Sequence, residues 1–176
     1  MRKYLTFGIL IVLISCKQKV VVLETAKEVH DIENYVNGIE SFIHHINIST
    51  KDSDSISIEE LKFIKNSHNI TINITDKNVT YRNRKIVKVK FRDYLENNFV
   101  KVKSFYYNQD ELVCVKIYEL LPTDDKKTGI YKRMLYYKKN KLLLDSNKSD
   151  YKYQNGDLLS FGIEKLEKEY QSKIND

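Results

Sequence analysis

Proline, glycine and tryptophan are scarce in this chain: one proline, five glycines and no tryptophan occur among its 176 residues. No stretch rich in serine and glycine interrupts the sequence, and no segment repeats with a fixed period. These absences argue against a flexible linker and against a repeat protein. We therefore expect one domain over residues 23–176, which is long enough to bury a hydrophobic core.

Catalytic and cofactor-binding motifs are also missing. The chain has no glycine-rich phosphate loop, no nucleophile elbow and no pair of carboxylates beyond the random spacing of surface acids. None of the four histidines lies four residues from another, and the adjacent His44 and His45 diverge by about 100° on a helix. We therefore predict no metal, no cofactor and no catalytic signature.

Cysteine occurs only at positions 16 and 114. A thiolate nucleophile needs an accessible, electropositive setting and a base, for which His44 or His45 would be the candidates. Cys114 lies in the middle of a predicted strand, where a small, half-buried residue fits. We expect a structural role for Cys114 rather than catalysis.

A short basic and apolar segment stands at the start of the sequence. Arg2 and Lys3 precede an apolar run from Leu5 to Ile14, and the small residue Ser15 follows. This order is typical of an export signal. The run has roughly half of the ~20 apolar residues needed to cross a membrane. We expect residues 1–15 to be a signal peptide.

The stretch Leu13-Ile14-Ser15-Cys16 resembles the lipobox of bacterial lipoproteins. The resemblance implies that the Cys16 thiol accepts a diacylglyceryl group and that a peptidase cleaves before it, which leaves residues 16–22 as a lipidated tether. An acylated Cys16 leaves Cys114 without a partner for an internal disulfide. Lys17 in place of an aspartate implies the outer membrane, and the lack of acidic residues after it favours the periplasmic face.

Charge is divided unevenly along the mature chain. Loss of Arg2 and Lys3 lowers the lysine and arginine count from 30 to 28 against 24 acidic residues, so the net charge falls from +6 to +4. Residues 23–46 carry five acidic residues and one lysine, a net charge of −4, which leaves +8 for the rest. We expect either that this acidic segment packs against the basic remainder or that an external anion does.

The hydrophobic pattern predicts an α+β fold in two layers. Residues 23–46 have the spacing of an amphipathic helix, and Ser57 with Glu60 resembles the capping box of a short second helix. Alternating apolar residues then predict an antiparallel meander of about five or six strands. Asp157 is the expected N-cap of a C-terminal helix that packs on the sheet through Leu159, Ile163, Leu166 and Tyr170.

Turns with an even number of residues would keep the strands in phase, which predicts the two faces of the sheet. The expected core face carries Val87, Val89, Phe91, Val100, Val102, Tyr106, Val113, Val115 and Ile117. On the opposite face, Arg92, Lys103 and Lys116 would lie abreast on three neighbouring strands. With Lys101 and Tyr118 they form the predicted site for an anion or a partner.

These patterns favour a lipid-anchored envelope protein that acts by binding. The membrane is the expected partner of the acyl chains, and an envelope protein or an anionic surface is the expected partner of the domain. Nucleic acid is not expected, because an envelope lipoprotein rarely meets it. The alternatives are a module that carries a lipid or small ligand in an apolar cavity under a curved sheet and, less favoured, a small hydrolase.

Overall fold

A computed structural model describes residues 2–46, 55–65, 71–95, 98–121, 129–147 and 154–175. Two helices flank seven strands that lie in the sheet in chain order, each antiparallel to the next. The α+β meander is therefore confirmed, with seven strands rather than five or six. The elements are α1 (Arg2–Ile46), β1 (Ser55–Lys65), β2 (Thr71–Arg82), β3 (Lys85–Leu95), β4 (Asn98–Asn108), β5 (Glu111–Leu121), β6 (Gly129–Lys138), β7 (Lys141–Asp145) and α2 (Asn155–Asn175).

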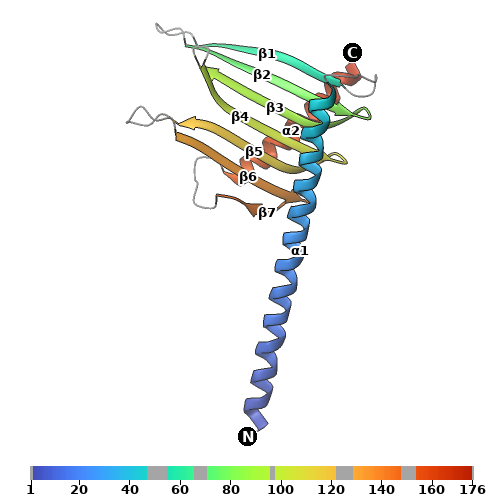
Figure 1. Cartoon of the computed structure of the whole chain (residues 1–176), viewed down its shortest axis with the longest axis vertical. Helices are drawn as coiled ribbons and strands as arrows, with labels where there is room; N and C mark the ends of the chain where they lie inside the picture. Colours follow the sequence, from blue (N-terminus) through green and yellow to red (C-terminus); the bar gives the residue numbers. More distant parts are fainter. Residues whose placement is uncertain are drawn as a thin grey trace.

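The two helices lie on opposite faces of the sheet (Figure 1). The prediction of two layers is wrong, because each sheet face carries its own set of apolar residues. One hydrophobic cluster joins α2 to the sheet through Leu158 and Leu166, and a second joins α1 to the other face through Val36 and Ile39. The domain thus has three layers, with the sheet in the middle.

Helix α1 follows the predicted spacing where it covers the sheet. Val29, Val36, Ile39 and Ile46 are buried, and their spacing of seven, three and seven residues keeps them on one helix face. Its acidic side also meets the sheet, because Glu28 pairs with Lys138 and the Tyr136 hydroxyl donates to Glu33 at 2.9 Å. The first half of α1 extends beyond the sheet (Figure 1) and contains residues 16–22.

Strand β1 occupies the segment where the sequence predicted a short helix. Ser57 and Glu60 do not form a capping box, since β1 pairs with β2 along its whole length, from Ser55 opposite Tyr81 to Lys65 opposite Thr71. A capping box is a local signal, whereas Ile56 and Ile58 alternate with polar residues as strands do. Pairing with the edge of β2 decides the outcome. Strand β7, also absent from the prediction, starts directly after a two-residue turn.

Three hairpins of this sheet have the same type of turn, and a β-bulge follows each turn. Their turns are Asn83-Arg84, Gln109-Asp110 and Lys139-Asn140, and both residues of each have positive φ between 49° and 66°. Such φ values are those of type I′ turns, whose twist matches that of antiparallel strands. Close after each turn a β-bulge inserts one extra residue into the second strand, namely Val87, Val113 and Leu143.

These bulges overturn the predicted core face. Each extra residue reverses the alternation of side chains, so Val87, Tyr106 and Val113 face α1, together with the cleft residue Val102 described below. Val89, Phe91, Val115 and Ile117 pack on the α2 side instead. Another bulge, at Asp93/Tyr94, makes Val100 the extra residue of β4; its side chain lies outside the described set. The nine predicted core residues therefore do not share one face.

Candidate functional site

Helix α1 crosses only the end of the sheet that carries the three bulged hairpins, and no other described helix covers the rest of this face (Figure 1). Beside the helix lies a cleft of about 430 Å³. Its basic residues are Lys88, Lys90, Lys116, Lys132 and Arg133, and Glu40 from α1 is the one acidic residue among the described residues that line it. Apolar and aromatic residues form much of the remainder: Val102, Tyr106, Ile117, Tyr118 and Met134, with Ser104 and Ser146.

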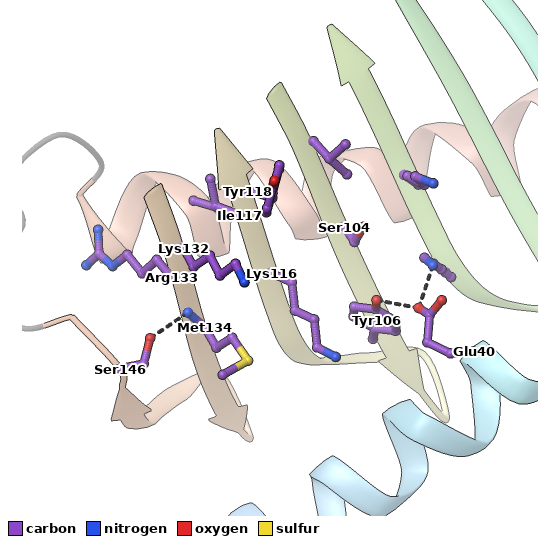
Figure 2. Close-up of a pocket in the computed structure, with 13 residues that line it drawn as sticks. Glu40, Ser104, Tyr106, Lys116, Ile117, Tyr118, Lys132, Arg133, Met134 and Ser146 are labelled. Carbon is purple, nitrogen blue, oxygen red and sulfur yellow. Dashed lines mark hydrogen bonds and ion pairs between the residues drawn. The ribbon is translucent and has the colours of Figure 1, made fainter. Parts of the chain in front are cut away.

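Glu40 joins α1 to the floor of the cleft. Its Oε1 accepts hydrogen bonds from the Lys88 ammonium and from the Tyr106 hydroxyl, each at 2.5 Å (Figure 2). Burial opposes ionisation of Glu40, but the hydrogen bonds from Lys88 and Tyr106 outweigh it and hold its pKa below the usual value. Lys88 is only 5% exposed, and its charge is neutralised by Glu40.

Three further ammonium groups of the cleft have no such partner. Among the described residues, no carboxylate lies within 4.0 Å of the Nζ of Lys90, Lys116 or Lys132. Partial burial, followed by the charges of Arg92 and Lys88, lowers the pKa of Lys90. Arg133 differs from these lysines because Asp145 binds its guanidinium, with Nη2 at 2.7 Å from Oδ2. The cleft thus holds a surplus of positive charge.

Aromatic rings lie close to the ammonium groups of Lys116 and Lys132, and also to that of Lys88. The ring of Tyr106 has the Lys88 Nζ 5.1 Å and the Lys116 Nζ 5.4 Å from its centroid, and the Lys132 Nζ lies 5.8 Å from the Tyr118 centroid. Lys116 extends from β5 towards Tyr106 and Glu40 (Figure 2). Ammonium groups at these distances are attracted by the ring faces, which restrains the lysine side chains without neutralising them. An anion with an apolar part fits these surroundings.

The predicted row of Arg92, Lys103 and Lys116 does not exist. Phe91 is opposite Lys103, Arg92 is opposite Val102, and Lys116 is opposite Ser104. Lys103 lies on the α2 face, with its Nζ 5.7 Å from the Phe161 centroid, and Lys101 shares that face. Of the predicted site residues, Lys116 and Tyr118 line the cleft, while Arg92 shares their face outside the lining.

The sequence prediction missed the contributions of Glu40, Lys132 and Met134 to this site. Glu40 was assigned only to the acidic side of a helix, because the place where a helix crosses a sheet is a tertiary property. One local signal could have revealed the bulges. Each turn is followed by two adjacent apolar residues, Ile86-Val87, Leu112-Val113 and Leu142-Leu143, where a regular strand with one polar face has one.

Cys114 is fully buried in the cluster between α1 and the sheet. Burial raises the pKa of its thiol to about 12, so the thiol is protonated at neutral pH. His44 and His45 are exposed on α1. Within the described part of the chain, no group of three or more histidine, cysteine, aspartate and glutamate side chains is arranged to hold a metal ion.

Comparison with known proteins gives no relative for this fold and cleft: no family model, no curated protein and no solved structure matches the chain. In the described residues, no helix combines the length and the apolar character needed to span a membrane.

Proposed function

We propose that this protein is a lipid-anchored binding protein of the cell envelope whose cleft captures an anionic ligand. The observation that carries the proposal is the group of three lysines, Lys90, Lys116 and Lys132, around a cleft of about 430 Å³ with no carboxylate partner among the described residues. Like charges held together repel one another, and a bound anion converts that repulsion into attraction. The volume is typical of a small-molecule site.

The carrier alternative is less well supported. A carrier of neutral lipid needs a mainly apolar cavity, whereas five basic residues line this cleft. A hydrolase has still less support, since Glu40, Lys88 and Tyr106 bind one another and the Cys114 thiol is buried. Binding remains the function that these side chains favour.

Replacement of Lys116 by glutamine tests the cleft. We expect inorganic phosphate to bind the full chain in nanodiscs of zwitterionic lipid, more weakly as salt rises, because the screening length shrinks to about 10 Å at 0.1 M. Lys116→Gln removes a charged hydrogen-bond donor and should weaken binding about tenfold to a hundredfold. Calorimetric titration, with empty nanodiscs as the reference, measures both effects.

Lys168→Gln is the matched control, because Lys168 is an exposed lysine on α2, on the opposite side of the sheet. It should bind phosphate as the wild type does. Equal loss of binding in both variants would mean that net charge, rather than the cleft, attracts the anion. No binding of phosphate to the wild type at low salt would reject the cleft as an anion site.

The lipid anchor rests on Cys16, and the protein's second cysteine provides a control. We propose that the protein is held on the periplasmic side of the outer membrane. Cys16→Ala should abolish acylation and the cleavage before residue 16, whereas Cys114→Ala should keep both. Mass spectrometry of the washed membrane fraction measures them. A Cys16→Ala chain with wild-type mature mass that stays in membranes after alkaline washing would contradict the anchor.

A further inference from the structure

Exposed apolar side chains lie beside the lysines of the cleft. Met134, which is 38% exposed, lines the cleft on β6, and Ile130, which is 56% exposed, lies four residues before it on the same strand face. Leu144, also 38% exposed, is opposite Tyr136 on β7 and shares this face. A single exposed apolar residue needs no explanation. Three of them share one face with Lys116 and Lys132, and Lys132 lies between Ile130 and Met134 on β6. Apolar and cationic side chains therefore alternate on this surface.

A smaller cavity beside α1 shares two lining residues with the cleft. Lys116 and Met134 line both the main cleft and a second cavity of about 160 Å³, whose other described residues are Glu33, Val36 and Asn37 on α1 and Tyr136 on β6. Met134 is opposite Lys116 in the pair of β5 and β6, so a molecule held by the Lys116 ammonium has Met134 beside it.

We propose that the ligand is a free, single-headed anionic amphiphile, with its head on Lys90 and Lys116 and its apolar body along Tyr118 and Met134. This inference rests on the proposed anion site and adds the class of ligand. The size of the cleft favours one small molecule over a bilayer surface, because about 430 Å³ is a volume typical of small-molecule sites and α1 forms one wall. Charge complementarity selects an anionic head over a neutral one.

A series of alkyl phosphates tests the inference. Inorganic phosphate and butyl, hexyl and octyl phosphate are titrated into the full chain in zwitterionic nanodiscs, with empty nanodiscs subtracted. Each methylene that is buried should strengthen binding about fourfold, which is the equivalent of about 0.8 kcal/mol. Octyl glucoside, which has the same chain and a neutral head, should bind at least tenfold more weakly than octyl phosphate, since it leaves the lysines unpaired.

Two serine variants separate the apolar part of the site from the charged part. Met134→Ser should reduce the gain in affinity between butyl and octyl phosphate several-fold. Leu142→Ser is the matched control: Leu142 is 41% exposed, but it pairs with Tyr137 and lies on the α2 face. It should behave as the wild type does.

The outcomes distinguish the amphiphile inference from the proposed anion site on which it rests. Affinity that rises with chain length and loses this rise in Met134→Ser supports the amphiphile. If inorganic phosphate and all three alkyl phosphates bind with the same affinity, the result supports the anion site and overturns the amphiphile. Loss of octyl phosphate binding when the nanodiscs contain phosphatidylglycerol would assign the site to the bilayer and overturn a free ligand. Absence of binding by phosphate and by the whole series would overturn both proposals.

Discussion

Replacement of Gly162 by valine should lower the free energy of unfolding by about 2 to 3 kcal/mol, the cost of overpacking a close helix-to-sheet contact. A Cβ atom at Gly162 would lie 2.7 Å from Cδ2 of Leu112 and 2.9 Å from Cδ1 of Phe105. The Tyr107 hydroxyl also donates a buried hydrogen bond of 2.8 Å to the Gly162 carbonyl, so α2 cannot withdraw without losing it. Urea unfolding followed by circular dichroism measures the change.

Gly38 of α1 provides the control, because among the described residues no atom beyond its own turns of helix lies within 4 Å of the position of its added Cβ. Gly38→Ala should raise stability by up to about 1 kcal/mol, the difference in helix propensity between alanine and glycine. The two variants should therefore change stability in opposite directions. If Gly162→Val unfolds at the wild-type urea concentration, α2 does not approach the sheet as closely as the structure indicates.

Removal of the charge of Asp145 should destabilise the domain by about 3 to 5 kcal/mol, because it leaves the Arg133 guanidinium buried without a counter-charge. Asp145 binds Arg133 through two hydrogen bonds, of 3.0 Å at Nε and 2.7 Å at Nη2, and both side chains are almost fully buried. Asp145→Asn keeps the shape of the side chain and changes its charge. The urea midpoint of this variant, compared with that of the wild type, measures the effect.

Two controls identify the cause of this loss. Glu164→Gln removes a carboxylate from the exposed ion pair with Lys168 and should leave the urea midpoint nearly unchanged, because water screens that pair. The double variant Arg133→Met with Asp145→Leu should recover most of the lost stability, because an apolar pair of similar volume needs no desolvation of charge. A double variant as unstable as Asp145→Asn would show that the loss does not come from the unpaired arginine.

Most of the architecture could be predicted from the sequence, because two periodicities dominate it. Val29, Val36 and Ile39 repeat at helical spacing, and their burial follows from that spacing. In the strands of the meander, apolar residues recur at every second position over most of their length. The prediction failed at Ser57 and Glu60, where a local capping signal competes with pairing to a strand that is distant in sequence, and such competition is decided by tertiary contacts.

The candidate site was predicted less completely, because its assembly depends on which face of the sheet each side chain occupies rather than on residue type. Lys116 and Tyr118 were assigned to it correctly, whereas Lys101 and Lys103 face α2 because the strands do not keep the assumed phase. Glu40 reaches the cleft only because α1 crosses the sheet at that point. Neither the phase nor the crossing point follows from hydrophobic alternation alone.

Because of the bulge at Val113, the charge of each sheet face depends on the number of residues between the turn and each lysine. Between the turn at Gln109-Asp110 and Lys116, the one extra residue directs Lys116 and Tyr118 towards α1. In a β5 shorter by this residue, the same lysine would point at α2 and Ile117 would take its position on the face towards α1. In a comparison of homologous chains, the number of residues between each lysine and its turn is therefore more informative than the identity of aligned residues. A deletion of one residue moves every side chain that follows it in the strand to the opposite face of the sheet.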